Sequence, residues 1–159
     1  MGDSCVAWQG PCQVSFDHMV DGEDLLQRAT IAGSDMVHFI VEIFNHQLLS
    51  GVLLQRVFAG LVKDVLLEMS PIKNLSIQRS GDDLYYKGKK LSISIATSSP
   101  VSTLVHFAVN VSNAGTPVET ACLKDLKINP KAFADKCMQA LKKEYNSSVI
   151  ATMKVRPVP

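Results

Sequence analysis

The stretch RSGDDLYYKGKKLSISI, residues 79–95, carries the pattern on which the fold prediction depends. Asp83–Tyr86 and Lys90–Ala96 both have the composition of strands, and the glycine turn at residues 87–89 between them predicts a β-hairpin. Strand pairing would bring the two aspartates at 82 and 83 close to the neighbouring basic residues. Such a cluster suits a nucleotide site, where basic groups stabilise phosphate charge and carboxylates hold magnesium. The alternative is a solvated hairpin with ordinary surface charges.

The sequence before this hairpin predicts strands, a short helical segment and one long helix. Cys5–Gln9 and Gln13–Phe16 have the character of short strands around a turn at Gly10-Pro11, and Asp21–Arg28 fits one or two helical turns. Asp35–Phe44 is continuously apolar, which predicts a strand buried on both faces.

The clearest helix is predicted over His46–Met69, ending at Ser70-Pro71. Apolar residues recur in it at four-residue steps, namely Leu49, Leu53, Val57, Leu61 and Val65, with Val52, Leu66 and Met69 beside them. Gln55 and Arg56 are among its polar positions.

The sequence after the helix adds further strands and a last helix. Leu75–Gln78 alternates, and Val101–Val111 alternates strictly, with His106 and Asn110 on its polar-bearing face, where a site could be lined. Asn129 before Pro130 predicts a helix start, with the helix running to about Tyr145 and Ser147–Met153 forming a short strand or extended tail. This order predicts an α+β domain over residues 1–159, in which helices pack on a mixed, mainly antiparallel sheet.

The composition is that of a globular chain with little surplus charge. The sequence has 159 residues, of which 47% are apolar and 19% charged, and its net charge of +1 provides no strong attraction for nucleic acid or an anionic membrane. Neither a secretory signal nor a membrane-spanning run is visible, so we expect a cytoplasmic chain. The four cysteines (Cys5, Cys12, Cys122 and Cys137) fit no zinc template and are expected to be free thiols.

Residues 79–95 resemble a motif of biotin protein ligases, K-W-P-N-D-[IL]-Y-x-x-G-[RK]-K-[IL]-x-G-I. That family continues with a strand ending in G-I-G-I-N-V, where this chain has HFAVNV at 106–111. An A-T-S-L-like segment and a C-terminal helix follow in the family, matched here by TACLKDL at 120–126 and the helix from Pro130. Four blocks in the same order cover roughly residues 48–145, so the resemblance implies the catalytic-core fold of biotin and lipoate protein ligases.

The resemblance also implies roles for individual residues. Asp83 matches the motif aspartate and Asn110 the terminal asparagine, which lie near the nucleotide and metal in the family. Lys90 matches a lysine that contacts the acyl adenylate, and Arg79 replaces the first lysine of the motif with a planar group for phosphate or carboxylate. The candidate catalytic residues are therefore Lys90 and Arg79, and the candidate ligand-binding residues are Asp82, Asp83, Lys89, Asn110, His106 and His38.

The chain departs from the ligases at the loop that holds ATP. Their arginine-glycine loop, G-R-G-R-x-G-R, should precede the strand at residues 35–44, but residues 14–34 contain only Arg28. Three segments (Arg79–Tyr85, Lys89–Pro100 and Gly10-Pro11-Cys12) are more closely similar to a prokaryotic family named domain of unknown function 366. That resemblance implies the same ligase-like fold but supplies no activity.

We expect the chain to bind a small carboxylate-containing or nucleotide-like ligand in a sheet-lined pocket, with acyl activation or acyl transfer as candidate chemistry. Two alternatives stay open. One is an acyltransferase that uses Cys122 as a thioester nucleophile, and the other is a non-catalytic homodimeric binding module. The sequence selects no cofactor and no metal site, and it leaves open whether the chain is an enzyme.

Overall fold

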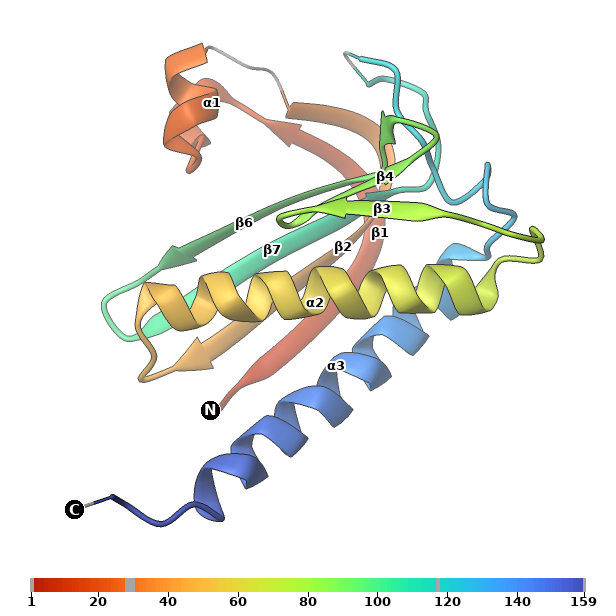
Figure 1. Cartoon of the computed structure of the whole chain (residues 1–159). Helices are drawn as coiled ribbons and strands as arrows, with labels where there is room; N and C mark the ends of the chain where they lie inside the picture. The colour runs from red at the N-terminus through yellow and green to blue at the C-terminus, as the bar shows by residue number, and fades with distance from the viewer. Residues whose placement is uncertain (1, 28–30, 117, 159) are drawn as a thin grey trace.

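The computed structural model describes residues 2–27, 31–116 and 118–158, and it contains two antiparallel sheets (Figure 1). The main sheet has four strands in the order β1-β2-β7-β6, and the smaller sheet has three in the order β3-β4-β5. The strands of the main sheet are β1 (Ser4–Val14), β2 (Ile31–Phe44), β6 (Ser92–Ser98) and β7 (Ser102–Asn110). Those of the smaller sheet are β3 (Ile77–Ser80), β4 (Asp83–Tyr86) and β5 (Lys89–Lys90). The predicted α+β class is confirmed.

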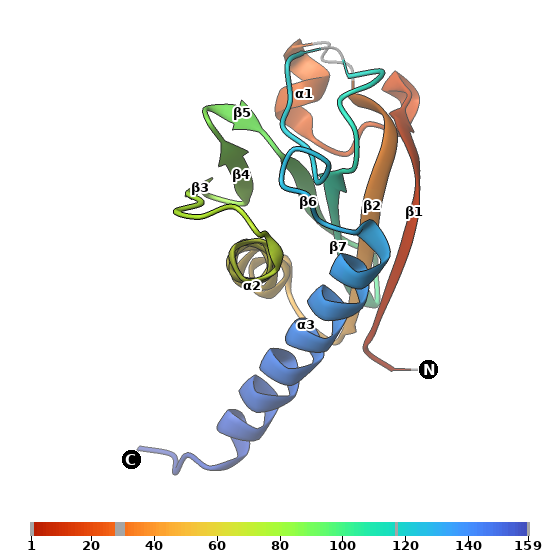
Figure 2. The same cartoon turned by 90° about the vertical axis from the view of Figure 1, so that its right-hand side faces the viewer.

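Two long helices cover one face of the main sheet, as Figure 2 shows. They are α2 (Leu48–Met69) and α3 (Pro130–Met153). The short η1 (Phe16–His18) and α1 (Gly22–Gln27) lie between β1 and β2 in the chain, at one end of the sheet. No helix in the described ranges is long and apolar enough to cross a bilayer.

A cluster of four phenylalanine rings joins the sheet to both helices. Phe39 on β2 and Phe107 on β7 are register partners, and Phe58 on α2 meets both in edge-to-face contacts, with centroids 5.2 and 5.3 Å away. Phe133 on α3 packs against Phe39 at 6.2 Å. All four side chains are fully buried, so this cluster fixes both helices on the sheet.

The strict alternation predicted for Val101–Val111 is confirmed by β7. Val105, Phe107 and Val109 face the helices and belong to the main core. His106 and Asn110 therefore project from the opposite face. That opposite face, hereafter the outer face, carries no long helix.

The predicted turn at Gly10-Pro11 is wrong, because β1 is one strand that runs through these residues. It pairs with β2 from Ser4 to Val14, and the register shifts by a β-bulge between Gly10 and Cys12. A bulge leaves one residue outside the hydrogen-bond ladder, which is where a proline without an N–H can be tolerated. The two short strands read from the sequence are the two halves of this bulged strand.

The buried face of α2 is not the side that carries the four-residue period. Of the five apolar residues at that spacing only Val65 is buried, and Leu49, Leu53 and Val57 are exposed, whereas Leu66 beside them is buried. The face on the sheet is formed instead by Gly51, Gln55, Phe58, Ala59, Val62, Val65 and Leu66. Gly51 is required there, because an added Cβ would lie 2.1 Å from Thr103 Cγ2 on β7. The four-residue period does not mark the buried face, because α2 is apolar on more than one side.

The last helix is longer than predicted. Asn129 accepts a hydrogen bond from the Ala132 N–H, and Pro130 occupies the first turn, so the predicted start is confirmed. The predicted strand or tail at Ser147–Met153 is wrong, since these residues continue α3. This part of α3 extends past the edge of the main sheet (Figure 2), where continuing the helix satisfies backbone groups that have no strand to join.

The hairpin prediction is confirmed with one change of connectivity. Leu91 ends the smaller sheet and enters the main one, because its N–H bonds to Leu84 O while its carbonyl accepts from Asn110 N. The predicted strand Lys90–Ala96 is therefore divided between β5 and β6, and the strand expected at Leu75–Gln78 begins two residues later, at Ile77.

Candidate functional site

The β3-β4-β5 hairpins arrange the polar residues of the quoted stretch. Gly81 and Gly88 have φ angles of 64° and 75°, which glycine adopts without strain and which close the two tight turns. The resulting register places Lys90 opposite Tyr85. Asp83 is two residues before Tyr85 on β4, so their side chains share one face of the small sheet.

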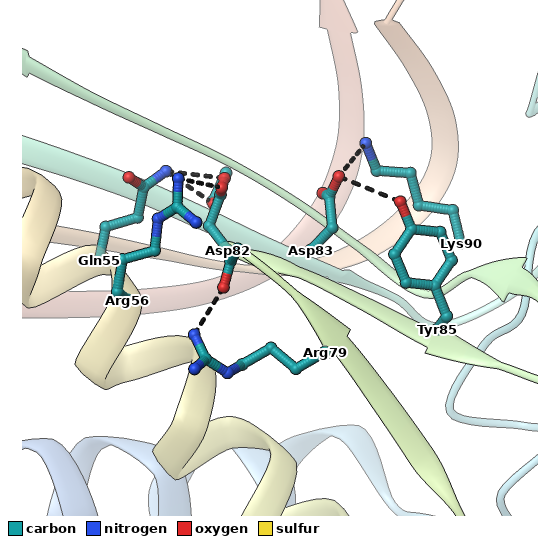
Figure 3. Close-up of polar contacts among 9 residues, drawn as sticks. Gln55, Arg56, Arg79, Asp82, Asp83, Tyr85 and Lys90 are labelled. Atoms are coloured by element: carbon teal, nitrogen blue, oxygen red, sulfur yellow. Dashed lines mark hydrogen bonds and ion pairs between the residues drawn. The ribbon is translucent and has the colours of Figure 1, made fainter.

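Asp83, Tyr85 and Lys90 form a connected group, hereafter the Lys90 cluster (Figure 3). Lys90 Nζ lies 3.0 Å from Asp83 Oδ2, and the Tyr85 hydroxyl donates to the same oxygen at 3.3 Å. The Lys90 and Asp83 side chains are 40% and 26% exposed, so an incoming ligand can reach both. Burial and the charge of Asp83 raise the pKa of Tyr85, which therefore remains a hydrogen-bond donor at neutral pH.

Asn110 lies one backbone segment away from Lys90. The Lys90 carbonyl accepts from Ala121 N at 2.9 Å, and the carbonyl of Ala121 accepts from Asn110 Nδ2 at 3.1 Å. Asn110 is buried, with 5% of its surface exposed, and this bond holds its side chain in place. The structure thus brings Asn110 next to the backbone of β5 rather than into direct contact with the Lys90 cluster.

Asp82 points the other way, toward α2 and β6 (Figure 3). Its Oδ2 accepts from Gln55 Nε2 at 2.9 Å and from Ser94 Oγ at 2.7 Å, and its other oxygen lies 3.4 Å from Arg56 Nη2. These partners make Asp82 a link between the hairpin, the helix and the main sheet. The neighbouring aspartates, predicted to act together, therefore face different surroundings.

Arg79 is also separate from the Lys90 cluster. Its Nη1 donates to the carbonyl of Gly81 at 2.6 Å, which places the guanidinium beside the β3-β4 turn (Figure 3). The predicted convergence of the four motif residues is therefore partial: Asp83 and Lys90 are paired, Asn110 is nearby, and Arg79 contacts the turn.

A polar cavity of about 320 Å³ opens beside β5. It is lined by Lys89, Asn113, Thr116, Val118, Glu119 and Thr120. Lys89 forms an ion pair with Glu119 at 3.1 Å, and Thr120 forms a β-bridge with Lys90. Lys89 and Lys90 are consecutive on β5, so their side chains start from opposite faces of the small sheet, and the cavity shares with the Lys90 cluster the backbone of β5 and not a face.

His38 and His106 lie together on the outer face, away from these groups. Their rings stack with centroids 5.3 Å apart, and Trp8 stacks on His38 at 4.9 Å. His38 Nε2 lies 3.2 Å from the carbonyl of Gly10, which can only accept, so that nitrogen carries the proton. In the neutral ring His38 Nδ1 then accepts from His106 Nε2, 3.0 Å away. This network fixes one tautomer for each histidine.

The histidine pair makes stability depend on pH. Burial, together with the neighbouring His38, lowers the pKa of His106 from 6.5 to about 4, and burial also lowers the pKa of His38. Below about pH 6.5 the unfolded chain binds protons that the folded chain excludes, so we expect the free energy of unfolding to fall between pH 6.5 and 4, by on the order of 1–3 kcal/mol. Urea unfolding at several pH values measures this loss. His106→Gln should flatten the slope, and a slope equal to that of the original chain would contradict the assignment.

The geometry does not support Cys122 as a nucleophile. Its side chain is 2% exposed, and its Sγ donates to Asp125 Oδ2 at 3.3 Å. Burial raises the pKa of the thiol, so the reactive thiolate is disfavoured. None of the described cysteines forms a disulfide, as expected, and no group of three metal-ligating side chains occurs in the described ranges.

Sequence reasoning did not single out two of the residues in these networks. Tyr85 was part of the quoted motif but not a candidate, although a tyrosine two residues after an aspartate on a strand shares its face. Gln55 was assigned to the polar surface of α2 but is buried against Asp82 and Ser94. Its position between the buried Gly51 and Phe58 gives a helical-spacing signal, but only once the buried face is known.

Comparison with known families places this arrangement in a sequence family. A model described as Domain of unknown function (DUF366) matches residues 1–156. The chain belongs to the DUF366 family. The "Uncharacterized protein MJ0805" of Methanocaldococcus jannaschii is 31% identical over 153 residues, which are 92% of this chain and 66% of that relative. This DUF366 chain thus spans slightly less than two thirds of the length of that relative.

Solved structures confirm the fold that the motif resemblance implies. A protein of unknown function from Pyrococcus horikoshi is 40% identical and superposes with a TM-score of 0.94, covering all of this DUF366 chain and 84% of that one. Biotin protein ligase from Aquifex aeolicus superposes with a TM-score of 0.58 at 16% identity, over 70% of this chain and 52% of the ligase. The same ligase in complex with biotin and ATP gives a TM-score of 0.55 at 18% identity, over 72% and 51%. At such identities the likeness to the ligases shows a shared fold.

Proposed function

We propose that this chain binds a small ligand bearing a carboxylate or phosphate group at the Lys90 cluster. The observation that carries the proposal is the partly exposed ion pair between Lys90 and Asp83. A lysine held at 3.0 Å from a single carboxylate can exchange that partner for an anionic ligand without unfolding any element. The ligase-like fold supports this, since a solved neighbour of the same fold is in complex with biotin and ATP.

Each member of the cluster has a distinct task in this proposal. Lys90 supplies the positive charge that meets the anionic group of the ligand, and Asp83 holds the ammonium in place before binding. Tyr85, kept protonated by its raised pKa, offers a hydroxyl donor to a second oxygen of the same group.

Activation of the ligand by ATP is the more demanding form of the proposal. The arginine-glycine loop of the ligases is absent from residues 14–34, so triphosphate binding would depend on few cations. Lys89 is already paired with Glu119, and Arg79 contacts the Gly81 carbonyl. Ligand binding without activation is therefore the form that the geometry supports best; release of pyrophosphate in the presence of ATP and a bound acid would establish the stronger form.

Replacing Lys90 with glutamine should weaken ligand binding by about 10- to 100-fold, because a charge-assisted hydrogen bond is replaced by a neutral one. The measurement is the ligand-dependent rise in melting temperature across a panel of ATP, AMP, biotin, lipoate and short fatty acids, followed by calorimetric titration of any binder. Lys143→Gln, an exposed lysine on α3, is the matched control and should bind like the original chain.

Two results would contradict the proposal. One is a panel in which no compound raises the melting temperature at saturating concentration. The other is a ligand that binds Lys90→Gln and the original chain equally well, which would place its site elsewhere.

A further inference from the structure

The solvent-facing side of α2 is unusually apolar. Leu49, Leu53, Val57 and Leu67 are 66%, 57%, 45% and 38% exposed, although each is a large aliphatic side chain. In Figures 1 and 2 none of the drawn elements lies over the side of α2 that points away from the sheet. A row of exposed leucines along one helix is a typical feature of an interaction surface.

Gly60 lies at the centre of this surface. Each residue turns the helix by about 100° around its axis. Seen along that axis, Leu53 and Leu67 lie about 20° to either side of Gly60, and Arg56 and Asp64 lie about 40° to either side. Nothing in the chain lies within 4 Å of a Cβ added at Gly60, in contrast to Gly51. The fold of one chain therefore does not require glycine at this position, even though glycine weakens a helix relative to alanine.

We propose that α2 pairs with α2 of a second copy of this chain, antiparallel, about a two-fold axis that passes at Gly60. In such a pair the two Gly60 backbones lie in contact, Leu53 of each copy meets Leu67 of the other, and Arg56 meets Asp64. The absence of a side chain at Gly60 lets the helices approach closely.

The charges on this surface favour a second copy over another partner. Arg56 and Asp64 have opposite signs at equal distances from Gly60, so one two-fold axis forms two ion pairs at once. Asp64 is exposed and has no hydrogen-bond or ion-pair partner among the described residues. Arg56 is 45% exposed; its Nη2 contacts Asp82 and its Nη1 lies over Gly81, so a new carboxylate would be met by the N–H groups on the exposed side of the guanidinium.

The outer face of the main sheet is the competing surface for self-association. Val6 and Trp8 on β1 are 55% and 46% exposed there. Glu42 on this face accepts a hydrogen bond from Ser102, and the described strands β1, β2, β6 and β7 contain no lysine or arginine that could pair with it across a two-fold axis. Association through this face would thus lack the reciprocal charge pairing that α2 provides.

Sedimentation of the full chain between about 1 and 500 µM tests the proposal, since a helix-pair dimer of this size should dissociate within that range. Gly60→Leu should weaken the dimer by at least about tenfold and leave the melting temperature at low concentration unchanged or higher, because its own chain has room for the side chain. Asp64→Arg places an arginine opposite Arg56 at both of the symmetric positions, and the repulsion should weaken the dimer to a similar extent. Glu144→Arg, on exposed α3, makes the same change of charge and should leave the dimer intact.

The proposal is overturned if the chain sediments as a monomer throughout this range. It is equally overturned if a dimer forms that Gly60→Leu and Asp64→Arg do not weaken. A dimer lost on Val6→Lys but retained in both α2 variants would assign association to the outer face instead.

Discussion

Replacing Phe58 with alanine is expected to lower the free energy of unfolding by about 3–5 kcal/mol, the largest effect of any single substitution considered for this chain. Phe58 is fully buried and is the one residue of α2 that contacts aromatic rings of two adjacent strands. Alanine would leave a cavity between Phe39 and Phe107, and the sheet cannot close it because these rings are register partners held by the β2-β7 ladder.

The same substitution at an exposed phenylalanine provides the control. Phe16, in η1, is 56% exposed, so Phe16→Ala removes the same atoms without creating a cavity and should cost less than about 1 kcal/mol. Urea unfolding at low protein concentration measures both. If Phe58→Ala does not fold, Phe58→Leu, which retains most of the volume, should fold with a loss of about 1–2 kcal/mol. Equal losses for Phe58→Ala and Phe16→Ala would show that this cluster does not hold α2 on the sheet.

The fold could be predicted where local sequence patterns and tertiary burial agree. Strict alternation in β7, the glycine turn before β5 and the Asn129-Pro130 start of α3 each have a local physical cause, and each is confirmed. The α+β class followed from the order of these elements.

The failures arise where a tertiary contact decides between local alternatives. The leucine row of α2 has the stronger four-residue period, but packing selects the face that presents Gly51 to Thr103 and Phe58 to the phenylalanine cluster. Periodicity cannot show which of two apolar faces is buried. For the same reason the β-branched residues after Tyr145 favoured a strand, although α3 continues beyond the sheet.

The candidate site was predictable as a set of residues but not as a geometry. The hairpin register brings Lys90 to Asp83, as the strand pairing implied. The orientation of the Asp82 side chain was not predictable, because it is set by hydrogen bonds from Gln55 on α2 and Ser94 on β6. Consecutive residues on a strand start face opposite sides, so adjacent aspartates are poor candidates for a shared metal or ligand.

Because Asp82 and Asp83 face opposite sides, replacing Asp82 should produce the second large loss of stability. Asp82→Ala is expected to lower the free energy of unfolding by about 2–3 kcal/mol, because it removes the acceptor for the buried Gln55 amide and the Ser94 hydroxyl. Those two groups retain one hydrogen bond to each other, which limits the loss. Ligand binding at the Lys90 cluster should be retained once the variant is measured well below its melting temperature.

Asp83→Ala should show the reverse pattern, and this contrast tests the separation of structural from ligand-binding roles. Its partners Lys90 and Tyr85 are partly exposed, so water replaces the lost carboxylate and the free energy of unfolding should change by less than about 1 kcal/mol. Removing Asp83 also frees the Lys90 ammonium from its resting position, so the affinity for an anionic ligand should change severalfold while stability stays nearly constant. Thermal unfolding gives the stability of Asp82→Ala and of Asp83→Ala, and calorimetric titration gives the ligand affinity of each. If Asp82→Ala is the variant that changes affinity and Asp83→Ala the one that loses stability, Asp82 and not Asp83 faces the ligand, and the site must be moved to the side of the hairpin that contacts α2.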